Sequence, residues 1–190
     1  MTNRFIVILS GKPGAKHESM GVKMPQGNLT VAIINAHQPG DRAEQSTPKL
    51  VEDVRALVTA LDSTESVDII VVSTDNPLVD QAARELGAVN RLEERGVEAT
   101  ANGVASRIIE SEESTLEEEA WVLYLDTRLA DYDFPEVIRR AFTAQSVNSS
   151  ARGLQAVGID VDHVLHFFEA GAFVESSSLP VAGAIDFLAN

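Results

Sequence analysis

Three polar loops contain the side chains of this sequence that could bind a phosphorylated ligand. They span residues 11–16, 74–77 and 126–129, and each follows an apolar segment typical of a buried strand. In open α/β sheets, ligands bind beyond the carboxyl ends of the strands. We therefore expect the three loops to meet at one edge of a sheet and to hold a nucleotide or a sugar.

The first loop has the composition of an anion-binding loop. Its sequence, G-K-P-G-A-K, contains Gly11, Lys12, Gly14, Ala15 and Lys16. Glycine lets backbone N–H groups approach an anion closely, and lysine supplies positive charge. Because the spacing is neither GxxxxGK[ST] nor GxGxxG, an ordinary strand-to-helix turn is the alternative interpretation.

The second loop follows the segment V-D-I-I-V-V-S. Ser73 and Thr74 are suited to a ribose or a base edge, and Asp75 is suited to a sugar hydroxyl. The alternative role for Asp75 is to cap the helix that follows.

Two carboxylates indicate a magnesium site. Asp126 directly follows the segment A-W-V-L-Y-L, and Asp186 lies in the late segment G-A-I-D-F. Two carboxylates together with substrate phosphates are a common way of holding Mg²⁺. Asp160 and Asp162 are alternatives to Asp186, and the alternative for Asp126 is to pair with Arg128 or to cap a turn.

Several other classes of function are not supported. The sequence has no cysteine, and it contains no GxSxG or HExxH motif. His163 and His166 are three residues apart in a strand-like segment, which places them on opposite faces and argues against a zinc site. The net charge is −14, with every lysine in the first 49 residues, so no nucleic-acid partner is expected.

Length and composition predict a single domain over residues 1–190. The chain is 44% hydrophobic, which is enough to bury a sizeable core. No apolar run reaches the roughly 18–20 residues of a membrane span, and the first ten residues lack the pattern of a signal peptide. We therefore expect a cytoplasmic protein that has no membrane partner.

Strand-like and helix-like segments alternate along the chain. Strands are predicted at 4–10, 29–36, 67–73, 89–92, 120–125, 154–159, 164–168 and 172–175, and helices at 48–62, 78–86, 102–111 and 134–144. Strands separated by helices pair in parallel through right-handed crossovers. The prediction is an α/β fold of three layers, in which a mostly parallel central sheet has helices on both faces.

Residues 67–88 resemble the cytidylyltransferases that make CMP-activated acidic sugars, namely the acylneuraminate (CMP-sialic acid) and CMP-KDO synthetases. The family has the same phrase of a strand, then S-T-D, then a helix ending in G-A, as in V-V-S-T-D-N-P-L-V-D-Q-A-A-R-E-L-G-A here. Residues 48–61, 92–109 and 125–142 are similar in order to its flanking segments. The resemblance covers residues 1–145 and leaves 146–190 as a shortened C-terminal part.

The sequence diverges from the family at its signature loop. Residues 14–16 match the G-S-K part of the family's A-R-x-G-S-K, and Pro25 and Asn28 match part of its P-x-K-N after about six extra residues. The signature arginine is absent, and Gly27 replaces a lysine. The strand at 29–36 is interpreted as an extra element, because the family has only a short link there.

The resemblance implies a nucleotide-diphospho-sugar transferase-like fold and a nucleotidyltransferase activity. The reaction would transfer CMP from CTP to an acidic sugar and release pyrophosphate. A homodimer is also implied, although the part after residue 145 is shorter than the family's usual dimerisation arm. The alternatives are a catalytically degenerate relative that binds a ligand or a protein, and an unrelated doubly wound domain.

The resemblance also assigns roles to residues. Catalysis would depend on Lys16 and Asp126, and Mg²⁺ would be held by Asp126 and Asp186. Nucleotide-binding residues would be Gly11, Lys12, Gly14, Ala15, Lys23, Asn28, Ser73, Thr74 and Asp75.

Overall fold

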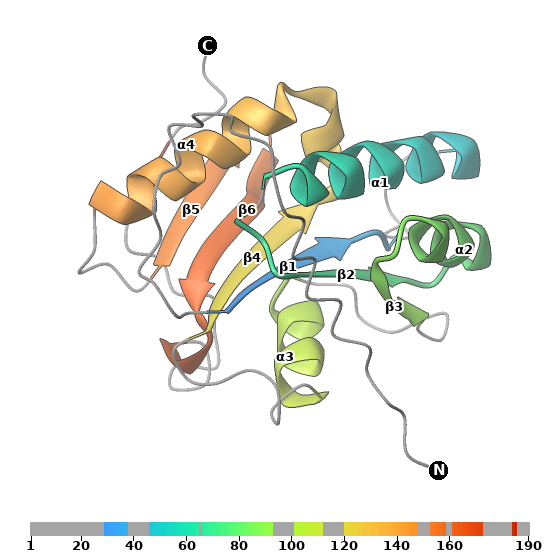
Figure 1. Cartoon of the computed structure of the whole chain (residues 1–190), viewed down its shortest axis with the longest axis horizontal. Coiled ribbons are helices and arrows are strands. Elements are labelled where there is room, and N and C mark those ends of the chain that lie inside the picture. The colour runs from blue at the N-terminus through green and yellow to red at the C-terminus, as the bar shows by residue number, and fades with distance from the viewer. Residues whose placement is uncertain are drawn as a thin grey trace, which may run out of the picture.

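A mixed sheet forms the middle layer of the molecule (Figure 1). The computed structural model describes residues 29–37, 46–64, 66–92, 101–111, 120–147, 153–158, 161–172 and 184–185. The elements are β1 Thr30–Asn35, α1 Thr47–Asp62, β2 Ile69–Thr74, α2 Pro77–Glu85, β3 Val89–Leu92, α3 Ala101–Ser111, β4 Trp121–Asp126, the 3-10 helix η1 Thr127–Asp131, α4 Phe134–Val147, β5 Gly153–Gly158, β6 Val161–Glu169 and β7 Ala184–Ile185. The strand predicted at 4–10 lies outside the described residues.

The strand order within the described residues is β3-β2-β1-β4-β6-β5-β7. β1 pairs in parallel with β2 and with β4, and β2 pairs in parallel with β3. β6 is antiparallel to both β4 and β5, whereas β5 and β7 are parallel. The predicted mostly parallel core is therefore confirmed over β1 to β4, and an antiparallel pair extends it on one side.

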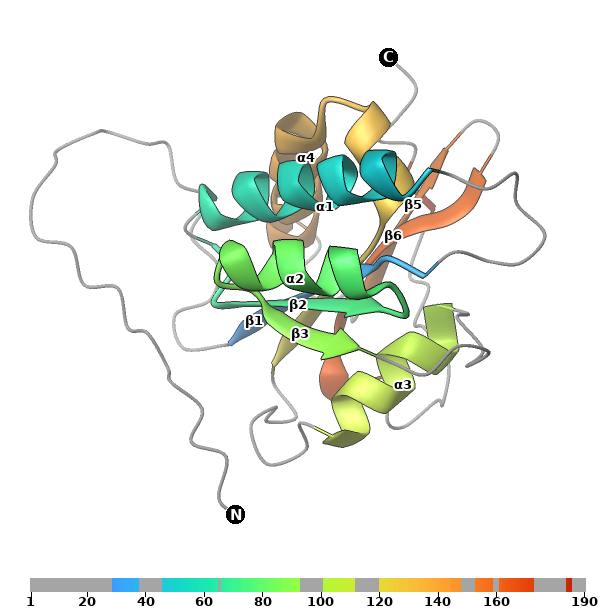
Figure 2. The same cartoon turned by 90° about the vertical axis from the view of Figure 1, so that its right-hand side faces the viewer.

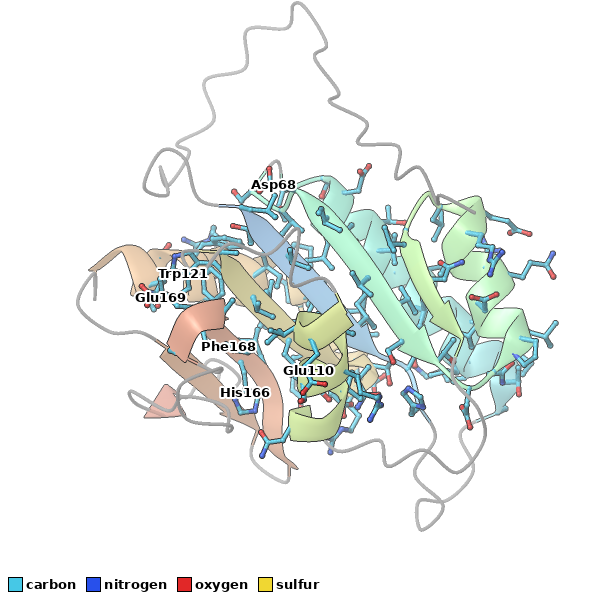
Figure 3. All side chains as sticks on the ribbon, turned by 90° about the horizontal axis from the view of Figure 1, so that it is seen from below. Asp68, Glu110, Trp121, His166, Phe168 and Glu169 are labelled. Carbon is cyan, nitrogen blue, oxygen red and sulfur yellow. The ribbon has the colours of Figure 1, made fainter. Side chains whose placement is uncertain are left out.

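Helices cover both faces of this sheet (Figure 2). One face packs against α1, α2 and α4, and the other packs against α3. Alternate residues of each strand enter the two cores, so that Ile34 lies on the α1 face and Ile33 on the α3 face. Figure 3 shows His166 and Phe168 of β6 on the face that α3 covers.

The central strands have the sequences that complete burial requires. All residues of β1 and of β4 are buried, which explains their continuous apolar runs T-V-A-I-I-N and W-V-L-Y-L-D. α1 is amphipathic and buries Leu50, Val54, Leu57 and Leu61 at helical spacing. Within the described residues, no helix has the length and the apolar character needed to cross a membrane.

The ends of the helices differ in detail from the prediction. Ser46 is the N-cap residue of α1, but its side chain makes no capping hydrogen bond. The cap of α2 is Asn76 rather than Asp75, since the side chain of Asn76 accepts a hydrogen bond from the Leu78 N–H. Gly87, with φ of 80°, ends α2 in the left-handed conformation, as glycine allows.

Two predictions about strands need correction. The segment predicted as an extra strand at 29–36 is β1, which lies in the centre of the sheet between β2 and β4. The strand predicted at 172–175 is wrong at its start, because residues 170–172 form a helical turn directly after β6. Residues 173–175 lie outside the described part of the chain.

Candidate functional site

The carboxyl ends of β1, β2 and β4 meet at one edge of the sheet, which we call the carboxyl rim. In the register of the sheet, Asn35 at the end of β1 pairs with Ser73 of β2 on one side and with Asp126 of β4 on the other. The rim therefore brings together the second and third predicted loops, which are far apart in the sequence. This is the edge where ligands bind in open α/β sheets.

A chain of buried hydrogen bonds links β1, β2 and β4 at the rim. His37 Nε2 lies 2.9 Å from Ser73 Oγ. The His37 N–H donates to Asn35 Oδ1, and Asn35 Nδ2 donates to the Tyr124 hydroxyl over 2.6 Å. All four residues are buried. We call this set the rim network, and it fixes the backbone where the loop after β1 begins.

The predicted residues of the second loop separate into different environments. Ser73 is fully buried and belongs to the rim network. Thr74 is also fully buried, and its hydroxyl bonds to the Ala36 carbonyl and the Asn76 N–H, so it holds the loop together. Asp75 is half-buried and forms no hydrogen bond or ion pair with any described residue.

Asp126 both caps a turn and pairs with Arg128, which is the alternative that the sequence left open. Its Oδ1 accepts hydrogen bonds from Arg128 N–H over 3.0 Å and from Arg128 Nε over 2.7 Å, while Oδ2 accepts from Nη2 over 2.9 Å. The carboxylate side chain is 12% exposed and the arginine side chain 28%. This bidentate ion pair places a guanidinium at the end of β4.

A second ion cluster joins the first turn of α1 to η1. Lys49 Nζ lies 2.6 Å from Asp53 Oδ1 and 2.9 Å from Asp131 Oδ1. These hydrogen bonds, first to Asp53 and then to Asp131, raise the pKa of Lys49 above its ordinary value. Among the described residues, Lys49 is thus the lysine that lies beside η1, the segment after β4. It was not among the site residues predicted from the sequence.

The carboxylate predicted to hold magnesium, Asp126, is bonded to Arg128 in the structure. Both oxygens of that carboxylate bond to Arg128, so a dication there would have to displace a guanidinium. Within the described ranges, no three His, Asp or Glu side chains gather in a way that could hold a metal ion. The partner predicted for Asp126, Asp186, lies outside those ranges.

The remaining predicted site residues also lie outside the described residues. They are Gly11, Lys12, Gly14, Ala15, Lys16, Lys23 and Asn28. The central position of β1 shows which loop begins beside Ser73 and Asp126, namely the loop after residue 36. Asn35 and His37 were not predicted as site residues because the strand at 29–36 was interpreted as an extra element, although its run L-T-V-A-I-I-N-A is typical of a buried central strand.

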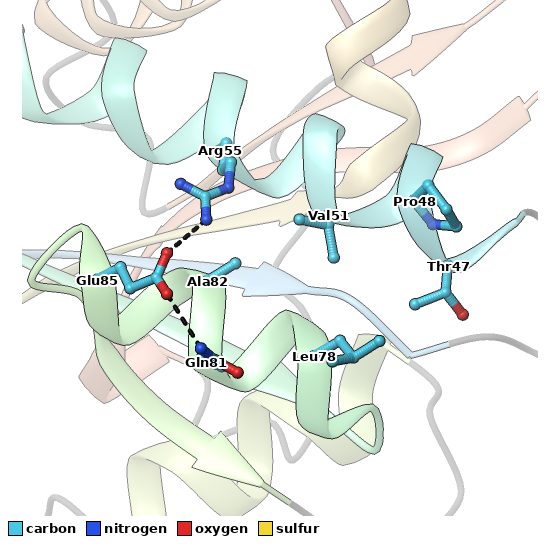
Figure 4. A pocket seen from close by; sticks show the side chains of 8 residues that line it. All are labelled: Thr47, Pro48, Val51, Arg55, Leu78, Gln81, Ala82 and Glu85. Atoms are coloured by element: carbon cyan, nitrogen blue, oxygen red, sulfur yellow. Dashed lines mark hydrogen bonds and ion pairs between the residues drawn. The ribbon is translucent and has the colours of Figure 1, made fainter.

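A groove between α1 and α2 is a separate feature (Figure 4). It has a volume of about 330 Å³ and an apolar floor that includes Val51 and Ala82. The Arg55–Glu85 ion pair lies at one end of it and Leu78, which is 59% exposed, at the other. None of the predicted site residues lines this groove.

Comparison with known proteins gives structural similarity only. No family model and no curated protein matches the chain. A CMP:2-keto-3-deoxy-manno-octonic acid synthetase in complex with CTP is similar with a TM-score of 0.58 and 12% identity, over 82% of this chain and 80% of that chain. A 4-diphosphocytidyl-2C-methyl-D-erythritol synthase has a TM-score of 0.55 and 16% identity, over 80% of both chains.

A third similar structure agrees with these two. The 4-diphosphocytidyl-2C-methyl-D-erythritol synthase of Anaerococcus prevotii DSM 20548 has a TM-score of 0.55 and 13% identity, over 79% of this chain and 75% of that chain. At such low identity the likeness concerns the arrangement of the strands and helices. The resemblance predicted from residues 67–88 is confirmed at that level: this chain has the α/β fold of these synthases and of the CMP-sugar synthetase.

Proposed function

We propose that this protein is a nucleotidyltransferase that transfers CMP from CTP to an acidic sugar and releases pyrophosphate. The observation that carries the proposal is the carboxyl rim, where Ser73 and Asp126 flank Asn35 in a fold shared with a synthetase that binds CTP. One of the similar structures is described as a complex with CTP. CTP and the acidic sugar are the partners that this proposal names.

The chemistry would be an in-line substitution at phosphorus. A hydroxyl oxygen of the sugar attacks the α-phosphate of the nucleotide, and the bond from that phosphorus to the bridging oxygen breaks. Pyrophosphate leaves with the electron pair of that bond, and the hydroxyl proton passes to water. Such transfers depend mostly on positioning and on neutralising the phosphate charge. Rigid contacts at the rim would supply the positioning.

The rim network is suited to that positioning role. Ser73 has no exposed surface, so it would act by orienting His37 rather than by touching the ligand. The predicted ligand contacts from Lys16 and Asn28 remain part of the proposal, as does phosphate binding by Lys12 or Lys23. Asp75, which has no partner among the described residues, keeps its predicted role toward a sugar or ribose hydroxyl.

Magnesium remains a prediction to be tested with the nucleotide present. Because Asp126 is bound by Arg128, no step of the proposed reaction is assigned to a metal on that carboxylate. The assay therefore compares the same protein with Mg²⁺ and with a chelator. A cytoplasmic location and a homodimer likewise remain proposals, and size-exclusion chromatography with light scattering measures the oligomeric state.

A catalytically degenerate relative is the second candidate, and one observation favours it. The two cations described at the rim, Lys49 and Arg128, are each paired with carboxylates already. A polyphosphate arriving there would meet cations whose charge is already largely neutralised by these carboxylates. A protein of this kind would bind its ligand or a partner protein without transferring a nucleotidyl group.

Pyrophosphate release separates the two candidates. The purified protein is incubated with each of the four nucleoside triphosphates and an acidic sugar, with and without Mg²⁺, and released pyrophosphate is measured by a coupled assay. We expect release with CTP that depends on the sugar. Binding of CTP without any release would favour the degenerate relative, and neither binding nor release with any nucleotide would contradict both candidates.

A further inference from the structure

We propose that Arg128 is an oxyanion-binding residue of the carboxyl rim and that Asp126 is its positioning residue. The ligand group would be a phosphate or a carboxylate, each of which presents two oxygens to a planar guanidinium. This inference deepens the proposed function, since CTP carries phosphates and an acidic sugar carries a carboxylate. It rests on that function only for the identity of the ligand.

The Arg128 guanidinium has N–H donors that its ion pair with Asp126 does not use. Its Nε–H and one N–H of Nη2 bond to Asp126. Arginine carries five N–H donors and cannot accept hydrogen bonds. The other donors of Arg128 have no partner among the described residues. At 28% exposure, the side chain is neither sealed in the core nor freely solvated, so its remaining donors are available to a ligand at the rim.

Asp126 holds the guanidinium in a defined place. The carboxylate is 12% exposed, belongs to the last residue of β4, and also accepts from the Arg128 backbone N–H. The same aspartate therefore fixes both the turn and the arginine side chain. Holding a binding group in place in advance reduces the entropy lost when the ligand arrives.

The setting of this pair differs from that of the other ion pairs. Arg55 bonds to Glu85 across the outer surface of α1 and α2, at the end of α2 that lies away from the rim. Arg139 bonds to Glu136 within α4 and is 63% exposed. Arg128 is instead two residues from the rim position that pairs with Asn35. Arg128 lies in η1, directly after the end of β4, so this ion pair is at the carboxyl rim and not on the outer surface of a helix.

The competing assignment of Asp126 to Mg²⁺ predicts the opposite effect of one substitution. If the carboxylate holds a metal, Arg128→Ala frees it and strengthens binding that depends on Mg²⁺. If the guanidinium receives the oxyanion, Arg128→Ala weakens binding, and it does so in the presence of a chelator. The sign of the change therefore distinguishes the two assignments.

The test is isothermal titration of the full chain in EDTA with two probes, tripolyphosphate and 2-keto-3-deoxy-manno-octonic acid. We expect Arg128→Ala to weaken at least one probe by about ten-fold or more, the usual scale for a lost charge-assisted hydrogen bond. Arg128→Lys should weaken it less, because lysine keeps the charge but loses the planar fork. The matched control, Arg55→Ala, should bind like the unmodified protein.

The pattern of losses identifies the source of the oxyanion. A loss confined to tripolyphosphate assigns Arg128 to the nucleotide phosphates, and a loss confined to the sugar acid assigns it to the substrate carboxylate. Unchanged affinity for both probes in Arg128→Ala would overturn the inference, as would stronger Mg²⁺-dependent binding in that variant or no binding by the unmodified protein. If Arg128→Ala does not fold, Arg128→Lys and Arg128→Gln decide by the same criteria.

The result is separable from the catalytic proposal. Binding that depends on Arg128 without pyrophosphate release would remove the proposed activity and leave this inference in place. Pyrophosphate release with CTP that is unaffected by Arg128→Ala, together with unchanged probe binding, would do the reverse.

Discussion

Two neighbouring parts of the carboxyl rim are held by different interactions, one by buried hydrogen bonds and the other by a partly exposed ion pair. The rim network of Asn35, His37, Ser73 and Tyr124 is held by hydrogen bonds between polar side chains, and all four residues are buried. The Asp126–Arg128 pair is ionic and partly open to solvent. Buried neutral groups that bond to one another fix a geometry, whereas an open charged pair retains the capacity to bind something else. The rim thus combines a rigid part with a receptive one.

The largest stability effect is expected in the rigid part. Tyr124→Phe removes the acceptor of the Asn35 amide at a buried position, so the free energy of unfolding should fall by about 1–3 kcal/mol. Urea denaturation followed by circular dichroism measures it. Tyr132→Phe is the matched control at an exposed tyrosine and should stay within about 0.5 kcal/mol. Equal effects of the two substitutions would mean that the rim network adds no rigidity.

A smaller effect is expected from the receptive part. Asp126→Asn replaces a carboxylate that accepts three hydrogen bonds from Arg128 with an amide that has one acceptor oxygen. We expect a loss of about 1–2 kcal/mol in the same measurement, because the pair is only partly shielded from water. A loss larger than that of Tyr124→Phe would reverse the comparison and make the ionic pair the main structural element.

Lys49 tests whether the second ion cluster resembles the rim pair. Its side chain is 44% exposed, so solvent weakens its bonds to Asp53 and Asp131. Lys49→Met should cost up to about 1 kcal/mol at neutral pH. The pKa of Lys49 is higher in the folded protein than in the unfolded chain. The stabilisation by its ion pairs is therefore complete below the unfolded pKa and is lost only as the pH rises through the folded pKa. A cost that fell between pH 7 and 9 would contradict this assignment.

The smallest effect concerns the outer surface of α4, which has no role at the rim. Hydrogen bonds from Arg139 and then Arg140 lower the pKa of Glu136 to about 2. Because the pKa of Glu136 is lower in the folded protein, these bonds stabilise the fold at pH values above the unfolded pKa of 4.5. This stabilisation is lost as the pH falls toward 2. Nuclear magnetic resonance titration of the Glu136 carboxyl carbon should show this pKa, and Arg139→Ala with Arg140→Ala should raise it. A midpoint near 4.5 in the unmodified protein would refute the pairing.

Local patterns predicted the elements well, and nonlocal pairing explains what they missed. The helix over 48–62 and the strand over 120–125 follow from periodicity and apolar runs within a few residues. The apolar run at 29–36 was interpreted as an extra strand beside the run at 4–10, and no local signal says which of the two pairs with β2. The structure places 29–36 there.

The rim illustrates the same limit at the level of single side chains. Ser73 and Asp126 were predicted because each lies at the carboxyl end of a strand, where ligands bind in α/β sheets. This prediction does not require knowledge of which strands are neighbours. His37 and Tyr124 were missed because their bonds span 36 and 89 residues and exist only in the folded sheet. The Asp126–Arg128 pair, only two residues apart, was within reach of the sequence as an alternative.

The pairing of β4 with β6, a strand that comes much later in the chain, has a consequence for folding during synthesis. β4 is paired with β1 on one side and, among the described strands, with β6 on the other, through partners such as Leu125 with Leu165 and Trp121 with Glu169. During synthesis on a ribosome, β4 therefore has an open hydrogen-bonding edge until residue 169 has emerged. Open strand edges invite pairing with other chains. A nascent chain stalled near residue 147 should be a target for chaperones, whereas a chain whose residue 169 has emerged can cover this edge of β4.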